Sequence, residues 1–251
     1  MCTVCGCEDK HGHPDSVAGN GALAVDKSVS RTLTLEKNIL EKNNVYASQN
    51  RSFCYSKQIL SLNFVSSPGA GKTSLLVDTI NSLKSDFSIN VIEGDQHTSN
   101  DADKIRATGA SAVQINTGKG CHLEAHSVGH AIKDLQPAQQ SLLFIENVGN
   151  LVCPAEFDLG ELAKVLILSV TEGEDKPLKY PHMFRAASLL IINKIDLLPY
   201  VDFDMAQCVR FARQVNPSID VICLSVKTRE GVLPWFEWMT TQQTKMNREP
   251  D

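Results

Sequence analysis

Short apolar runs alternate with amphipathic segments along most of the chain. The runs are nearly continuous in leucine, isoleucine and valine, which is typical of parallel strands covered on both faces. They predict strands at residues 59–65, 89–93, 112–116, 142–146, 164–170, 188–193 and 220–224. Apolar side chains at helical spacing predict helices at 72–84 and near 99–107, 121–134, 203–214 and 232–243. This alternation predicts a doubly wound α/β domain with a mostly parallel sheet.

The first 30 residues have a different character. Residues 1–30 are rich in glycine, aspartate and serine and poor in large apolar side chains, which predicts a flexible N-terminal extension. The domain is expected at residues 31–251, beginning with a loosely amphipathic helix at residues 33–47. The apolar side chains at 33–40 pack on the domain or offer a contact surface to a partner, and the sequence leaves both interpretations open.

The charge and hydropathy of the chain exclude several classes of protein. Twenty-four basic residues against 29 acidic ones give a net charge of −5, so no nucleic-acid partner is expected. The longest apolar run, residues 165–170, is shorter than the roughly 20 residues that span a bilayer, and no secretory signal is recognisable. A cytoplasmic location is therefore predicted. Among eight cysteines, three lie in apolar surroundings and are expected to be buried, inert thiols: Cys54, Cys208 and Cys223.

A glycine-bearing loop lies between the first predicted strand and the next helix. The sequence SSPGAGKT at residues 66–73 has the spacing of a phosphate-binding loop, with Ser66 where the general pattern has glycine. The predicted nucleotide ligands are Pro68, Gly69, Ala70, Gly71, Lys72, Thr73 and Ser74. The helix N-terminus favours phosphate, Lys72 is expected to neutralise the β- and γ-phosphates, and Thr73 to place its hydroxyl on Mg²⁺.

Two carboxylates are candidates for the catalytic steps beside Lys72. Glu146 ends a predicted strand and is interpreted as a carboxylate that binds Mg²⁺ directly or through another ligand, and the N–H of Gly149 is expected to donate to the γ-phosphate. Asp95 follows another strand, at the sheet edge where α/β proteins bind ligands. It is interpreted as a Mg²⁺-linked or water-orienting carboxylate, with a surface turn acid as the alternative.

The sequence NKID at residues 193–196 predicts selectivity for guanine. Asp196 can accept from two donors that guanine presents and adenine lacks, and sites of this kind reject the wrong base strongly. Lys194 is expected along the base plane, beside Asn193. A further base contact is predicted at Ser225, Val226 and Lys227. GTP and GDP are therefore the expected nucleotides.

Five further cysteines require a different explanation, and metal binding provides one. Cys2, Cys5 and Cys7 offer three soft ligands for zinc, Cu(I) or Ni(II), with a fourth ligand from water, the chain's own amine, His11 or His13. Cys121 and His122 are expected to open a helix whose N-terminus favours the thiolate. Cys153 lies four residues after Gly149 and would move when GTP is hydrolysed. His126, one turn after His122, is a further candidate.

Long runs of this sequence resemble the HypB family of hydrogenase maturation GTPases, which belong to the SIMIBI class of P-loop proteins. The similarity covers residues 1–7 and nearly everything from about 59 to 240. Its most specific motifs are at residues 2–7, 66–73, 93–95, 114–118, 121–123, 144–154, 169–181 and 193–196. A urease-type nickel GTPase would share the nucleotide motifs, but the cysteines at 2–7 and the run at 147–154 do not suit it.

The resemblance implies a GTP-dependent nickel chaperone for nickel–iron hydrogenase assembly. It further implies GTP-dependent homodimers with a metal site near the dimer interface, built from Cys121, His122 and Cys153. Zinc remains an alternative ion for that site. Mg²⁺ contacts carry over to Thr73, Asp95 and Glu146. The implied partners are hydrogenase accessory proteins and the hydrogenase large subunit. A signalling switch, which would need no thiolate sites, is the alternative from another class.

Overall fold

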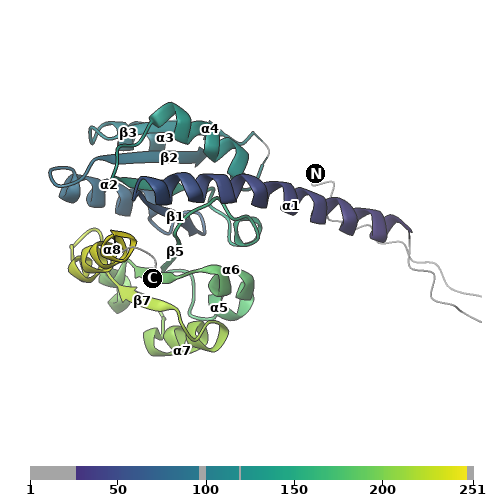
Figure 1. Ribbon diagram of the computed structural model, residues 1–251. Helices are drawn as coiled ribbons and strands as arrows, with labels where there is room; N and C mark the ends of the chain where they lie inside the picture. The colour runs from purple at the N-terminus through teal and green to yellow at the C-terminus, as the bar shows by residue number, and fades with distance from the viewer. Residues whose placement is uncertain (1–26, 96–99, 119, 248–251) are drawn as a thin grey trace, which may run out of the picture. The chain divides into compact units, whose positions relative to one another are not determined.

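The computed structural model describes residues 27–95, 100–118 and 120–247, and Asn38–Asp251 packs as one compact unit. Its centre is a seven-stranded sheet with the strand order β3-β2-β4-β1-β5-β6-β7, and every pairing is parallel (Figure 1). The strands are β1 Leu60–Ser66, β2 Ile89–Asp95, β3 Ser111–Asn116, β4 Leu142–Glu146, β5 Ala163–Ser169, β6 Leu189–Asn193 and β7 Asp220–Cys223. The doubly wound parallel sheet predicted from the sequence is confirmed.

The helices lie on both faces of this sheet. They are α1 Lys27–Ser56, α2 Lys72–Leu83, α3 Asn100–Arg106, α4 Ala125–Leu135, α5 Lys176–Lys179, α6 Pro181–Ala186, α7 Met205–Val215 and α8 Val232–Asn247. Two short 3₁₀ helices are η1 Cys153–Ala155 and η2 Ile195–Tyr200. Within the described parts of the chain, none of the helices is long and apolar enough to cross a membrane.

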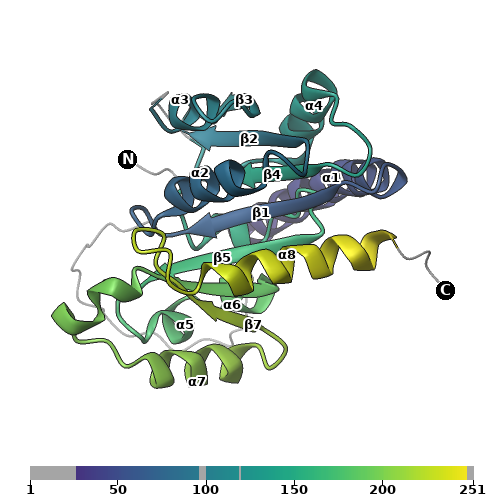
Figure 2. The same ribbon diagram turned by 90° about the vertical axis from the view of Figure 1, so that its left-hand side faces the viewer.

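One face of the sheet is covered by α2, α3 and α8. Side chains of a strand alternate between its two faces, and every second residue of β1, including Leu62 and Phe64, packs in this layer. Trp235 of α8 is fully buried here and donates its indole N–H to Thr79 of α2 over 2.9 Å. In Figure 2, α2 and α8 lie in front of the strands and α1 lies behind them.

The opposite face carries α4 and the C-terminal half of α1 over β2 and β4, and α6 and α7 over β5 and β6. Cys54 and Cys208 belong to these two layers and are 2% and 0% exposed. Burial raises the pKa of the Cys54 thiol to about 11 and that of Cys208 to about 12. Cys223 is half-buried, with its Sγ 3.5 Å from the Sδ of Met205. The prediction of buried thiols is confirmed for Cys54 and Cys208.

Two predicted elements differ from the observed ones. The first helix runs from Lys27 to Ser56, well beyond the predicted residues 33–47. The fourth begins at Ala125, so the prediction that Cys121 and His122 open it was wrong. Both residues lie in the loop between β3 and α4. The expectation that a helix N-terminus favours the thiolate of Cys121 therefore does not hold.

Candidate nucleotide and metal sites

The loop between β1 and α2 has the backbone of a phosphate cradle. Gly69 and Gly71 adopt φ values of +76° and +103°, which residues with a side chain rarely adopt. A Cβ at Gly71 would also lie 2.4 Å from Nδ2 of Asn193, so only glycine fits there. The departure at Ser66 has a structural reason, because the Lys72 ammonium donates to its hydroxyl over 3.0 Å.

A cavity of about 490 Å³ opens above this loop. Every predicted phosphate-loop residue from 68 to 74 lines it except Ala70, which is buried. Glu146, Gly149 and Lys194 line it as well, as the sequence predicted. The volume falls within the roughly 300–1,000 Å³ of small-molecule sites. Lys104, on α3, is a further lining residue that no sequence motif had indicated.

Hard oxygen ligands meet at one side of the cavity. The hydroxyl of Thr73 donates to the carboxylate of Glu146 over 2.7 Å, and Glu146 is only 5% exposed. Carboxylate and hydroxyl oxygens suit Mg²⁺, so these two residues fit the predicted ion. Glu93 lies in register with Glu146 on the adjacent strand and is 2% exposed, and no sequence argument had singled it out. Asp95 ends β2, but its side chain lies outside the described residues, and its role stays a prediction.

The guanine motif is tied to the phosphate loop by two side chains. Asn193 donates to the carbonyl of Ala70 over 2.9 Å, and Lys194 donates to that of Gly69 over 2.7 Å. Asp196 accepts from the hydroxyl of Ser225 over 2.6 Å, so the structure brings these two predicted base ligands together. Val226 and Lys227 form a turn after β7, and neither they nor Asp196 and Ser225 are among the residues that line the cavity.

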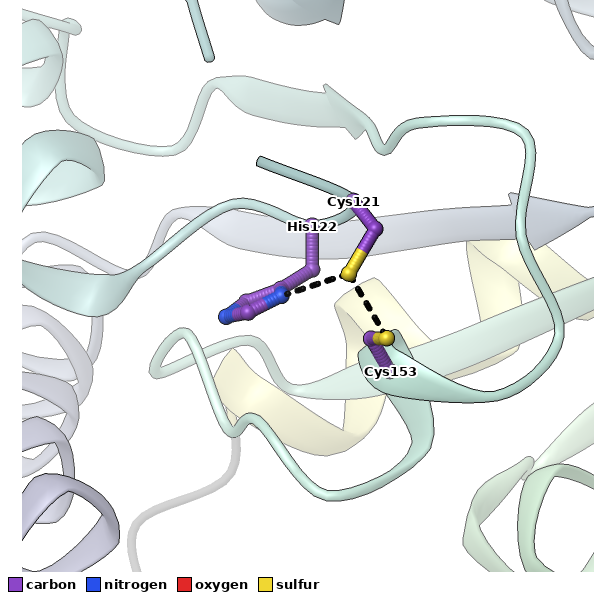
Figure 3. A group of neighbouring side chains, drawn as sticks. All are labelled: Cys121, His122 and Cys153. Atoms are coloured by element: carbon purple, nitrogen blue, oxygen red, sulfur yellow. Dashed lines mark hydrogen bonds between the residues drawn. The ribbon is translucent and has the colours of Figure 1, made fainter. Parts of the chain in front are cut away.

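A second cluster lies where the loop before α4 meets η1. The side chains of Cys121, His122 and Cys153 point toward one another, with their ligand atoms all within 4.8 Å (Figure 3). The two Sγ atoms are 2.7 Å apart, and Nδ1 of His122 lies 3.6 Å from Sγ of Cys121. Two thiolates and an imidazole are ligands of zinc and nickel, and the proximity of these three atoms makes the group a candidate site for a single ion.

Burial favours the neutral form of the His122 ring, which is the form that binds a metal. Its ring packs on Phe157 at a centroid distance of 3.8 Å, and burial lowers its pKa because the charged imidazolium is disfavoured there. The neutral ring keeps a lone pair for a metal, and thiolates with imidazole suit nickel and zinc. His126 does not join this cluster, since its ring contacts Tyr46 and His130 instead. Cys2, Cys5 and Cys7, with His11 and His13, lie outside the described residues.

Comparison with known proteins gives one consistent family. Residues 61–223 match the CobW/HypB/UreG nucleotide-binding domain. The chain is 60% identical to the hydrogenase maturation factor HypB of Rhizobium leguminosarum bv. viciae over 212 residues, which are 84% of this chain and 71% of the relative. It is 50% identical to the HypB of Azotobacter vinelandii, with 97% of this chain and 93% of the relative covered.

Solved structures agree with the sequence comparison. The fold matches HypB from Archaeoglobus fulgidus with a TM-score of 0.76 and 36% identity, over 81% of this chain and 99% of that one. HypB from Helicobacter pylori in complex with nickel matches with the same TM-score and identity, over 84% of this chain and 99% of that one. The chain therefore belongs to the HypB family of hydrogenase maturation factors, with a nucleotide-binding domain of the P-loop NTPase fold.

Proposed function

We propose that this protein is a GTP-hydrolysing nickel metallochaperone, which delivers Ni(II) during the maturation of nickel–iron hydrogenase. The observation that carries the proposal is that one segment serves both candidate sites. Glu146 at its start accepts from Thr73 in the nucleotide cavity, and Cys153 at its end belongs to the metal cluster. The nickel complex of the Helicobacter pylori relative supports nickel as the cargo.

In the proposed reaction, the triphosphate lies over residues 68–74 and the guanine base against Asp196. Lys72 neutralises charge on the β- and γ-phosphates, while Asp95 orients the water that attacks the γ-phosphate. Mg²⁺, when bound by Thr73 with Glu146 and Asp95, supplies further positive charge to these phosphates. The sequence offers no arginine finger, a group that raises rates by about 10³–10⁵-fold, and intrinsic turnover is therefore slow.

GTP binding promotes a homodimer, and hydrolysis to GDP loosens the metal cluster by moving Cys153. Nickel then passes to the hydrogenase large subunit through accessory proteins. Cys2, Cys5 and Cys7 form a second, tight site that receives or presents one ion. Zinc competes for the internal site, because two thiolates and an imidazole suit either ion.

The test is a nickel titration of the reduced protein, without nucleotide and with Mg²⁺ and GTP. The comparison variants are Cys2/Cys5/Cys7→Ser and Cys121/Cys153→Ser. The first should lose the tight thiolate–nickel band, and the second should lose a separate site that responds to nucleotide. Nickel binding that ignores both the substitutions and the nucleotide would overturn the proposal and leave a signalling switch. Turnover within about 1–100 per second, as in kinases, would contradict the slow hydrolysis.

A further inference from the structure

Two asparagines after β4 hold the loop that carries the metal ligands. Asn147 is 1% exposed, and its Oδ1 accepts from the backbone N–H of Leu123 over 3.2 Å. The side-chain amide of Asn150 donates to the carbonyl of Cys121 over 3.2 Å. These two bonds hold the backbone on either side of His122, so both asparagines affect the geometry of the metal cluster.

The same segment contacts the nucleotide site. Val148 and Gly149, which lie between the two asparagines, line the nucleotide cavity. Gly149 is close to the phosphate loop, because a Cβ there would lie 3.2 Å from atoms of Pro68. Gly149 directly precedes Asn150 in the chain. A change in the nucleotide phosphates beside Gly149 would therefore act on the residue next to Asn150.

Buried hydrogen bonds fix both ends of this segment. At one end, Asn147 donates to Asn63 over 3.3 Å, and Asn63 donates to Glu161 over 3.0 Å. At the other end, Lys164 donates to the carbonyl of Pro154 over 2.7 Å. Buried networks of this kind are costly to break, so movement is confined to residues 148–153 between the two fixed points.

Two side chains of that interval contact Cys121: Asn150 donates to its carbonyl, and the Sγ of Cys153 lies 2.7 Å from its Sγ. The Oδ1 of Asn150 also accepts from the N–H of Val152 over 2.9 Å, which orients the amide toward Cys121. A shift of Gly149 is thus passed to Cys121 through Asn150 and to Cys153 along the chain. Loss of Asn150 would remove one of the contacts through which the backbone of Cys121 follows Gly149.

We infer that Asn150 is a positioning residue that couples the nucleotide state at Gly149 to the Cys121–His122–Cys153 site, while Asn147 holds the loop in both states. This inference rests on the proposed function. Coupling between two sites is reciprocal, so nickel changes the nucleotide affinity by the same factor by which nucleotide changes the nickel affinity. Couplings of this kind are on the order of 5–150-fold.

The experiment measures the nickel affinity of the full chain with GDP and with a non-hydrolysable GTP analogue, both with Mg²⁺. A Cys2/Cys5/Cys7→Ser background leaves the internal site as the reporter. Asn150→Asp keeps the acceptor for Val152 but places a carboxylate against the Cys121 carbonyl, whereas Asn150→Ala removes both bonds. Asn44→Asp, at an exposed position on α1, controls for the added charge.

Both Asn150 variants should bind nickel and nucleotide, while the ratio of nickel affinities between the two nucleotide states falls well below the parental value, because only the path along the chain to Cys153 remains. The effect of nickel on nucleotide affinity should fall by the same factor. A parental ratio that persists in both variants, or that is lost in Asn150→Asp alone, would overturn the coupling role. A parent whose ratio differs from one, with variants that keep that ratio, would overturn this inference alone, whereas a parental ratio of one would also overturn the release of nickel on hydrolysis. A parent without nickel at the internal site would overturn the proposed function with it.

Discussion

Lysine side chains reach the nucleotide cavity from three different elements. Lys72 opens α2, Lys194 follows β6, and Lys104 projects from α3. Lys72 and Lys194 donate to atoms of the phosphate loop itself. Lys104 is exposed, but the neighbouring Ile105 is fully buried and fixes the helix against the sheet. A cation held on this helix adds positive charge to a cavity that would bind a triphosphate.

We expect Lys104→Ala to weaken GTP binding by about tenfold. A hydrogen bond to a charged group contributes about 1.5–3 kcal/mol, and about 1.4 kcal/mol corresponds to a factor of ten, so the lower figure suits an exposed side chain. Titration with a fluorescent GTP analogue measures the change, and Lys104→Arg should retain most of the affinity. Arg106→Ala is the matched control, because Arg106 is exposed on the same helix and pairs with Asp103 at 2.9 Å. Equal affinities for Lys104→Ala and Arg106→Ala would refute the assignment.

At the scale of elements, α1 determines where α4 begins. The Oδ1 of Asn43 accepts from the N–H of Ala125, the first residue of α4, over 2.8 Å. Asn50 donates to the carbonyls of Ala125 and Leu159 over 2.8 and 3.0 Å. A Cβ at Gly129 would lie 2.7 Å from Oδ1 of Asn50, so a glycine allows this close approach. The helix start follows directly on the loop that carries Cys121 and His122.

Asn50→Ala should lower the free energy of unfolding by about 1–3 kcal/mol. The buried carbonyl of Leu159 loses its donor, while that of Ala125 keeps its bond within α4, and one buried group left without a partner costs about this much. Equilibrium denaturation in urea gives the value directly. Gln49→Ala, at the exposed neighbouring position, should change it by less than about 0.5 kcal/mol. If Asn50→Ala cost no more than this control, the polar docking of α1 would be unimportant for stability.

The same contacts explain which elements could be predicted from the sequence. The buried strands are continuous apolar runs, and the residues at their carboxyl ends, such as Glu146, follow from that pattern. The second half of α1 docks through buried asparagines as well as apolar residues, so its apolar periodicity is weak. The start of α4 depends on Asn43, which is distant in sequence, and no local pattern could show it. Lys104 lies in no motif, and its helix alone brings it to the cavity.

At the scale of the whole molecule, an exposed apolar side chain lies beside the metal cluster. Val152 is 61% exposed and directly precedes Cys153. The cluster supplies three protein ligands, which leaves a position for a further ligand on a four-coordinate ion. A second copy of the chain, meeting the first at this surface, would cover Val152 and approach the same ion. This arrangement agrees with the GTP-dependent homodimer of the proposed function.

We therefore expect sedimentation velocity to show a dimer with nickel, Mg²⁺ and a GTP analogue, and a monomer with GDP. Val152→Glu should weaken the dimer by at least about tenfold, because burying an apolar side chain contributes about 1.5–3 kcal/mol and the interface would contain the substitution twice. Leu233→Glu is the control, since Leu233 is 72% exposed on α8, which covers the opposite face of the sheet. A Val152→Glu dimer as stable as the Leu233→Glu dimer would place the interface elsewhere. If Val152→Glu is monomeric, its Cys121, His122 and Cys153 are still intact. A nickel titration of this variant then shows whether one copy alone holds nickel.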